Sequence, residues 1–375
     1  MNTPPLRLEI NPQVECAETL ASHFYTDPSV LVLEKKNVFL RTWQPVGTLS
    51  QPCGEANGVK HTIADPESFF TTDVADEPVV VTRDKVGTLR AFSNVCRHRA
   101  GPIAQGSGCK HVLKCAYHGW TYTLDGRLIG TPEIDGVEFF DRSEFGMVPL
   151  RLETWQQFIF VNFDADAPPL STYLGNIPEQ AKGFEFNGLG LAERRDYIVN
   201  CNWKVYVDNY LEGYHIPIVH PGLMKEIDYS RYRIETFRYY SQQLGPVKEI
   251  RPGDTGERVY PPGVGLQEAL YFWIFPNLML NFYPDNIQTN VIVPLSHDKT
   301  LTIFEWYFHD ASTQKTRERI KKAIEFSEAV QQEDMRICEA VQRGLNSSLY
   351  DRGRYSVKRE NGVHHFHMLL SEFLR

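Results

Sequence analysis

Two pairs of cysteine and histidine lie close together in the first half of the sequence, with the spacing of a metal site. Cys96-x-His98 precedes Cys115-x-x-His118, and sixteen residues separate the pairs. Both pairs are expected at strand ends, where two tight loops can direct their side chains to one point. Two thiolates on one iron and two imidazoles on the other would hold a [2Fe–2S] cluster with a raised reduction potential.

A Cys2His2 zinc site is the chemical alternative for these four residues. Zinc fingers continue with a short helix after the second pair, whereas GWTYTLDGRL predicts a strand and a hairpin. A rival pair, Cys109 and His111, repeats the first half of the pattern, but only three residues separate His111 from Cys115. Opposed loops cannot form across that gap, so Cys109 and His111 are expected to be structural.

A second group of possible metal ligands lies in the segment NWKVYVDNYLEGYHIPIVHPGL. Asp208, Glu212 and His215 fall at i, i+4 and i+7, which places them on one face of a helix that Pro217 is expected to stop. His220 lies beyond that break, so the chain can return and bring its imidazole beside the first. Two histidines and a carboxylate form the facial triad of non-heme Fe(II) oxygenases, which leaves positions open for O2 and substrate.

The carboxylate of this triad is expected on a long helix around QQEDMRICEAVQRGL. Asp334 shares an apolar stripe at helical spacing with Val330, Ile337, Val341 and Leu345, so it should face inward. A buried carboxylate is costly unless it is paired, hydrogen-bonded or bound to a metal. Iron ligation would supply that compensation, and the neighbouring Glu333 is the alternative ligand.

The remaining pattern predicts two kinds of domain. Residues 38 to 164 contain short strands with turn signals, including Asp125-Gly126 as a hairpin turn. The segment DADAPPL near residue 165 is a plausible boundary. Beyond it, helices near 202–216 and 313–345 occur with buried strands such as LYFWIFPNLMLNFY, which predicts an α+β domain.

Several features predict a cytoplasmic protein without membrane or nucleic-acid partners. No run of about 18 apolar residues is available to span a bilayer. The net charge of −8, without a lysine-arginine block, argues against nucleic acid. The start MNTPPLRLEINP lacks the pattern of a secretory signal, and seven scattered cysteines do not resemble a disulfide framework. No GxGxxG opens a helix after a strand, so flavin or nicotinamide is expected on another protein.

Both ligand motifs, in this order and roughly a hundred residues apart, resemble the large (α) subunits of Rieske-type non-heme iron oxygenases. The segments DNYLEGYHIPIVHPGL, QQEDMRICEAVQRGL and HHFHMLL are most similar to the choline and carnitine monooxygenases of that family. The resemblance implies cluster ligands at Cys96, His98, Cys115 and His118, and iron ligands at His215, His220 and Asp334. It also implies that Glu212 bridges the cluster of one subunit to the iron of the next, with Asp208 as the competing candidate.

The resemblance further implies a fold and a set of partners. A Rieske β-domain would be inserted in a helix-grip (START-like) catalytic domain, whose antiparallel sheet wraps on a long C-terminal helix. The expected parts are 1–40 and 165–375 for the catalytic domain, and 41–164 for the Rieske domain. Expected partners are O2, a small-molecule substrate, and a separate reductase or ferredoxin that passes electrons from NAD(P)H. The expected assembly is a homotrimer or a multiple of trimers.

The leading functional prediction is O2-dependent hydroxylation beside a quaternary ammonium. An aromatic cage would attract such a group, although strand aromatics also build cores. The alternatives are a ring-hydroxylating dioxygenase or an O-demethylase of an aromatic compound, an electron carrier without oxygenase activity, and a zinc-stabilised binding module. His364, His365 and His367 are expected to pack or cap. The candidate cage residues are Tyr206, Tyr210, Tyr271, Phe272, Trp273, Phe275, Phe282 and Tyr283.

Overall fold

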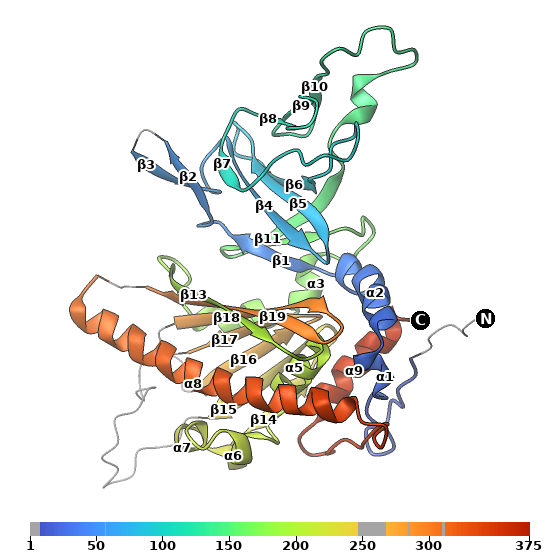
Figure 1. Cartoon of the computed structure of the whole chain (residues 1–375). Helices are drawn as coiled ribbons and strands as arrows, with labels where there is room; N and C mark the ends of the chain where they lie inside the picture. Colours follow the sequence, from blue (N-terminus) through green and yellow to red (C-terminus); the bar gives the residue numbers. More distant parts are fainter. Residues whose placement is uncertain (1–7, 57, 247–267, 284–285, 310–311) are drawn as a thin grey trace, which may run out of the picture. The chain divides into compact units, whose positions relative to one another are not determined.

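The computed structural model places the chain in two compact units, each with its own sheets (Figure 1). The inserted unit is Phe39–Leu170, and the larger unit joins Met1–Val38 to Ser171–Arg375. The limits of the functional domains, predicted at 40/41 and 164/165, remain a prediction, because these units are defined by compactness alone. The structure describes residues 8–56, 58–246, 268–283, 286–309 and 312–375.

Short antiparallel strands build the inserted unit. Its main sheet has seven strands in the order β1-β12-β11-β6-β5-β4-β7, and sheets of three strands (β10-β9-β8) and two strands (β2-β3) accompany it. The elements are β1 (Gln44–Thr48), β2 (Pro52–Ala56), β3 (Val59–Thr62), β4 (Ser68–Val74), β5 (Glu77–Arg83), β6 (Leu89–Ser93), β7 (Ser107–Cys109), β8 (Val112–Lys114), β9 (Thr121–Thr123), β10 (Leu128–Gly130), β11 (Pro149–Trp155), β12 (Phe158–Asn162), and the 3-10 turns η1 (Phe39–Arg41) and η2 (Arg142–Phe145).

Local sequence explains most of these strands. The β-branched run Val79–Val81 is fully buried at the centre of β5, as expected for an apolar strand. Asp125-Gly126 forms the predicted hairpin turn between β9 and β10. Gly126 has a φ of 93°, and a Cβ at this position would lie 2.6 Å from the Phe92 ring. Glycine is therefore required both by the turn and by the close approach of that ring.

A seven-stranded antiparallel sheet and one long helix form the core of the larger unit. The strand order is β13-β19-β18-β17-β16-β15-β14, and α8 runs across one face of the sheet (Figure 1). The elements are α1 (His23–Thr26), α2 (Pro28–Asn37), α3 (Leu170–Leu174), α4 (Ile177–Gln180), η3 (Ala181–Gly183), β13 (Gly190–Val199), α5 (Trp203–Tyr210), α6 (Ile216–Val219), α7 (Leu223–Glu226), η4 (Tyr229–Arg231), β14 (Arg233–Thr236), β15 (Tyr240–Pro246), β16 (Glu268–Ile274), β17 (Leu278–Phe282), β18 (Asn286–Ser296), β19 (Lys299–Phe308), α8 (Gln314–Leu345) and α9 (Asn361–Phe373).

The long helix α8 begins and ends close to the predicted limits. Thr313 caps it, because its side chain and that of Thr316 exchange hydrogen bonds with the backbone of the first turn. The sheet with its long C-terminal helix confirms the predicted α+β class. One part of the predicted apolar stripe was wrong, because Val341 is 43% exposed while Gln331 and Gln342 are buried. On α8, two polar glutamines are therefore buried where an apolar valine is partly exposed.

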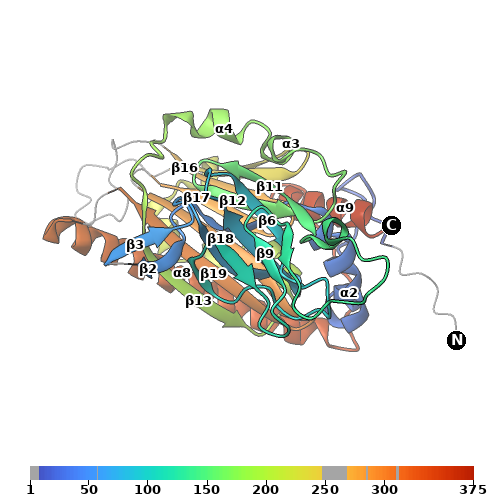
Figure 2. The same cartoon turned by 90° about the horizontal axis from the view of Figure 1, so that it is seen from above.

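The first helices of the chain belong to the larger unit, and α2 lies at the same end of it as α9 (Figure 2). Glu34 on α2 and Lys204 on α5 are almost completely buried, and their Oε1 and Nζ atoms lie 2.7 Å apart. The Trp203 indole donates a second hydrogen bond, of 2.7 Å, to Glu34. Burial raises the pKa of Glu34 and lowers that of Lys204, because each charged form loses its water. This pair ties the N-terminal segment to α5.

We expect Glu34→Gln to lower the free energy of unfolding of the larger unit by about 3–5 kcal/mol, because Lys204 would keep a buried charge without its partner. The double change Glu34→Leu with Lys204→Met should recover most of that loss. Urea unfolding followed by circular dichroism measures both effects. Removal of Glu179 from its exposed pair with Lys182 is the matched control and should change little. Equal effects of the buried and exposed changes would contradict the assignment.

Candidate metal centres

Two loops of the same form carry the four cluster candidates in the inserted unit. One loop starts at Cys96 after β6, and the other starts at Cys115 between β8 and β9. In each loop the cysteine N–H donates to the carbonyl five residues later, at 2.8 and 2.9 Å. Each cysteine carbonyl accepts a 3.0 Å bond from the residue four positions later, Ala100 or Gly119. Both of those residues have a left-handed φ, 56° and 73°, so the two backbones turn alike.

The loops bury the thiols and leave the imidazoles accessible. Cys96 and Cys115 are each 3% exposed, whereas His98 is exposed and His118 is half-buried. The two imidazole rings have centroids 4.6 Å apart. Burial raises the pKa of the Cys115 thiol, and the nearby Cys96 adds to this rise. A bound metal would replace the thiol protons.

This arrangement fits a two-iron cluster better than a single zinc ion. Among the described residues, only one set of three histidine, cysteine or acidic side chains brings its ligand atoms within 4.8 Å, and that set lies in the larger unit. The four loop residues do not form such a set, and they combine two buried thiols with two accessible imidazoles. The Tyr122 hydroxyl lies 3.3 Å from the Cys96 Sγ, a contact of the kind that tunes the potential of an iron–sulfur cluster.

Cys109 and His111 have structural partners of their own. The Cys109 thiol at the end of β7 lies 3.7 Å from the carbonyl oxygen of Cys53. His111 is exposed, and its Nδ1 lies 2.6 Å from a carboxylate oxygen of Glu67. These contacts account for the rival pair without a metal.

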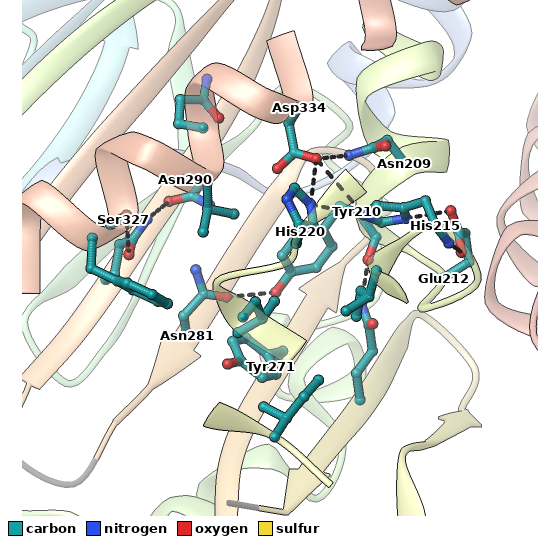
Figure 3. Close-up of a pocket in the computed structure, with 18 of the residues that line it drawn as sticks. Asn209, Tyr210, Glu212, His215, His220, Tyr271, Asn281, Asn290, Ser327 and Asp334 are labelled. Atoms are coloured by element: carbon teal, nitrogen blue, oxygen red, sulfur yellow. Dashed lines mark hydrogen bonds and ion pairs between the residues drawn. The ribbon is translucent and has the colours of Figure 1, made fainter. Parts of the chain in front are cut away.

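In the described part of the chain, the one compact set of ligand atoms consists of His215, His220 and Asp334 (Figure 3). The Nε2 atoms of the two histidines are 3.1 Å apart. One Asp334 oxygen lies 3.0 Å from the Nε2 of His220 and 3.7 Å from that of His215. Two imidazoles and one carboxylate that converge in this way can hold a mononuclear Fe(II) and leave coordination positions open.

The helix that was expected to carry Asp208, Glu212 and His215 on one face ends earlier than predicted. α5 stops at Tyr210. Glu212 then accepts hydrogen bonds from the backbone N–H groups of Tyr214 and His215. Such local side-chain acceptors replace the backbone bonds of a helix. The prediction of one continuous helical face was therefore wrong.

Pro217 does not stop a helix but begins one. It lies in the first turn of α6, where a backbone N–H would have no helical partner and proline is tolerated. His215 is the N-cap residue of α6, and His220 is its C-cap residue. One short helical segment therefore separates the two histidines, whose ring centroids are 4.9 Å apart.

A polar neighbour orients each of the three candidate ligands. These contacts hold the histidine Nε2 atoms and one carboxylate oxygen toward a common point. Burial disfavours protonation of His220, but the hydrogen bonds and charges of Asp334 and Glu333 outweigh burial and raise its pKa. Sequence reasoning missed the roles of Asn209 and Glu333. The contacts are Glu212 Oε1 to His215 Nδ1 at 2.6 Å, Glu333 Oε2 to His220 Nδ1 at 2.7 Å, and Asn209 Nδ2 to Asp334 Oδ1 at 2.7 Å.

Asp208 faces a different set of groups. The Tyr25 hydroxyl donates to one of its oxygens at 2.7 Å, and His367 Nε2 lies 2.9 Å from the other. His367 is buried, and its Nδ1 lies 2.6 Å from the Tyr355 hydroxyl. Asp208 and His367 are 159 residues apart in the chain, so no local pattern could have paired them.

A cavity of about 130 Å³ lies beside the triad. This is about ten times the volume that one water molecule needs, so the cavity suits a small organic molecule. Half of the predicted cage residues line it, and the other half are fully buried in the core instead. The lining members are Tyr206, Tyr210, Tyr271 and Tyr283. The core members are Phe272, Trp273, Phe275 and Phe282.

Comparison with known families identifies both units. Residues 58–141 match the Rieske [2Fe-2S] domain, and residues 186–375 match the ring hydroxylating alpha subunit (catalytic domain). The chain belongs to the Rieske-type ring-hydroxylating oxygenases. The family predicted from the two ligand motifs is thereby confirmed. Because the Rieske oxygenase has a matched catalytic domain, an electron carrier or a zinc-stabilised binding module does not describe it.

Relatives of this Rieske oxygenase include plant and bacterial enzymes. It is 37% identical over 383 residues to choline monooxygenase, chloroplastic, of Arabidopsis thaliana. This alignment covers 98% of this chain and 86% of the relative. It is 32% identical over 379 residues to the carnitine monooxygenase oxygenase subunit of Escherichia coli (strain K12). This alignment covers 97% of this chain and 96% of the relative.

Solved structures share the fold of this Rieske oxygenase. The quaternary ammonium Rieske monooxygenase CntA, in complex with its substrate L-carnitine, aligns with a TM-score of 0.79 and 31% identity over 97% of each chain. Naphthalene 1,2-dioxygenase from Rhodococcus aligns with a TM-score of 0.77 and 17% identity over 94% of this chain and 93% of that chain. The second likeness shows the fold alone.

The Rieske oxygenase is therefore an oxidoreductase with a [2Fe–2S] domain and a catalytic mononuclear-iron domain. The paired loops and the converging histidines and carboxylate fit these two cofactors. None of the helices in the described ranges is both long and apolar enough to cross a membrane.

Proposed function

We propose that this Rieske oxygenase incorporates one atom of O2 into a small substrate beside a quaternary ammonium. The observation that carries the proposal is the tyrosine-lined cavity next to His215, His220 and Asp334. Aromatic faces attract a cation by about 0.5–2 kcal/mol per contact. Relatives named for choline and carnitine monooxygenation support the same substrate class.

The proposal assigns a role to each candidate ligand. When bound, the mononuclear iron offers open coordination positions for O2, and the cluster delivers electrons to it one at a time. In the overall reaction, two electrons and two protons accompany O2, one oxygen atom enters a C–H bond, and the other leaves as water. The proposed cluster ligands are Cys96, His98, Cys115 and His118, and the proposed iron ligands are His215, His220 and Asp334.

The surrounding residues prepare the site for this chemistry. The carboxylates of Glu212 and Glu333 accept the Nδ1–H of His215 and His220, which leaves each Nε2 lone pair for the iron. The Asn209 amide holds Asp334 in the orientation that ligation needs. The four tyrosines that line the cavity exclude water and orient the substrate.

Electron supply and assembly belong to the same proposal. We propose a cytoplasmic homotrimer, or a multiple of trimers, that receives electrons from NAD(P)H through a separate reductase or ferredoxin. The family match to an oxygenase α subunit supports this, and the bacterial relative is itself named an oxygenase subunit. Sedimentation and titration with candidate reductases test these two points.

Glu212 is the proposed link between the cluster of one subunit and the iron of the next. We expect Glu212→Gln to keep the cluster and to load iron when iron is in excess, but to slow substrate-dependent cluster reoxidation by about 10- to 100-fold, because an amide nitrogen cannot accept a ligand N–H. Rapid mixing of the reduced protein with O2 measures this rate. Asp208→Asn is the comparison variant. A larger effect of Asp208→Asn than of Glu212→Gln would assign the link to Asp208.

A single turnover tests the proposed function directly. The reduced, iron-loaded protein is mixed with 18O2 and either choline, L-carnitine or an aromatic carboxylate. We expect a trimethylammonium compound to accelerate cluster reoxidation and to gain one labelled oxygen atom. Labelled product from the aromatic compound alone would overturn the substrate class. Two labelled atoms in one product would overturn monooxygenation.

A further inference from the structure

The wall of the cavity contains a group of buried amides that the iron site does not explain. Gln243, Asn281, Gln288 and Asn290 line the cavity and are only 2% to 4% exposed. Gln243 pairs with Tyr271, Tyr271 with Asn281, and Asn281 with Gln288 across neighbouring strands, so one polar row crosses the sheet. Buried amides are costly unless they are hydrogen-bonded. Gln243 and Gln288 have protein partners at both oxygen and nitrogen, so a ligand is the missing partner only for Asn281 and Asn290.

Protein contacts use the oxygen atoms of all four amides, and the Tyr232 hydroxyl donates to Gln243 Oε1. The Tyr210 hydroxyl donates to Asn281 Oδ1 at 2.7 Å. Ser327 donates to Gln288 Oε1 at 3.1 Å, and Gln288 Nε2 donates to Asn290 Oδ1 at 2.8 Å. Among the described residues, none accepts a hydrogen bond from Asn281 Nδ2 or Asn290 Nδ2. Both amides are thus anchored by their oxygens and present free NH2 groups in a cavity-lining position.

The charge of the cavity wall narrows the choice of ligand. The formally charged side chains among its described lining residues are Glu212 and Asp334, both acidic, apart from the two histidines. No lysine or arginine belongs to that described lining. Apart from the proposed iron, the described lining thus offers no cationic side chain for a substrate carboxylate, whereas its acidic groups attract a quaternary ammonium. The free NH2 groups suit a neutral oxygen.

We propose that Asn281 and Asn290 bind the hydroxyl oxygen of a quaternary ammonium alcohol, and that this contact selects net cationic alcohols over zwitterionic carboxylates. The inference rests on the proposed function, because it takes the ammonium group as given. Figure 3 shows the two amides on the left of the pocket, with His215 and Glu212 on the right. A substrate that spans the pocket would have one end at the two amides and the other end near His215 and Glu212.

Binding to the wild-type holoenzyme provides the first test, because it needs no variant. Anaerobic calorimetry compares choline with ethyltrimethylammonium, which has the same cation without the oxygen, and with L-carnitine. We expect choline to bind about tenfold more tightly than ethyltrimethylammonium, as the loss of buried hydrogen bonds predicts. We also expect choline to bind more tightly than L-carnitine.

Two variants then assign the contact to the amides. Asn290→Leu and Asn281→Leu should each weaken choline binding about tenfold, while the affinity for ethyltrimethylammonium stays within about twofold. Thr289→Val is the matched control, because Thr289 is buried on the same strand as Asn290 but does not line the cavity. It should leave all three affinities unchanged.

Three results would overturn the inference. They are equal affinity of the wild type for choline and ethyltrimethylammonium, tighter binding of L-carnitine than of choline, and an equal loss for both cations in the leucine variants. Failure of the proposed function has a different signature, since no trimethylammonium compound would then bind to any of the proteins.

Discussion

The Asp334→Ala protein is expected to lose its mononuclear iron and to keep its [2Fe–2S] cluster. Asp334 supplies the only carboxylate oxygen in the compact ligand set among the described residues. Loss of an outer-shell partner alone costs about 10- to 100-fold in metal affinity. Loss of a ligand should exceed the upper end of that range and abolish product formation. Iron analysis after mild chelation, together with the visible spectrum of the cluster, measures both metals.

Glu333→Gln is the matched control, because it changes the adjacent carboxylate on the same helix. Glu333 contacts the Nδ1 of His220 rather than the converging Nε2 atoms. We therefore expect this variant to bind iron about 10- to 100-fold more weakly but still to load when iron is in excess. If Glu333→Gln lost iron completely while Asp334→Ala kept it, the assignment of the two carboxylates would be reversed.

The second large effect is expected in the inserted unit, where Cys115→Ser should abolish the cluster. The thiolate is the ligand that holds one iron of a Rieske cluster, and a buried serine hydroxyl does not replace it. Visible absorbance and acid-labile sulfide should fall to background. Because the proposed function passes every electron to the iron through the cluster, turnover should also stop, although mononuclear iron should remain bound in the larger unit.

Cys109→Ser provides the control for that experiment. Cys109 repeats the Cys-x-His pattern, but its thiol contacts the Cys53 carbonyl instead of the two cluster loops. We expect Cys109→Ser to keep full sulfide content and activity. A cluster that survived Cys115→Ser, or one that was lost in Cys109→Ser, would show that the pairing of cysteines and histidines has been misassigned.

Sequence patterns predicted those parts of the protein that depend on near neighbours in the chain. Each cluster loop closes through hydrogen bonds that span only four or five residues, so its Cys-His pair marks it directly. The 3.6-residue periodicity of 313–345 predicted α8 because helical contacts repeat along one segment. The same reasoning failed at Tyr210, where Glu212 hydrogen bonds to the backbone in competition with the helix.

The sequence by itself thus determined the family, the α+β class and the two groups of candidate ligands. Only the tertiary structure decided which groups meet. His220 and Asp334 are 114 residues apart, and the packing of α8 near α6 selects Asp334 over Glu333 for the converging position. Asn281 and Asn290 lie in buried strands whose pattern does not distinguish a cavity wall from a core. The physical reason is that contacts between distant segments depend on packing, which local propensity does not encode.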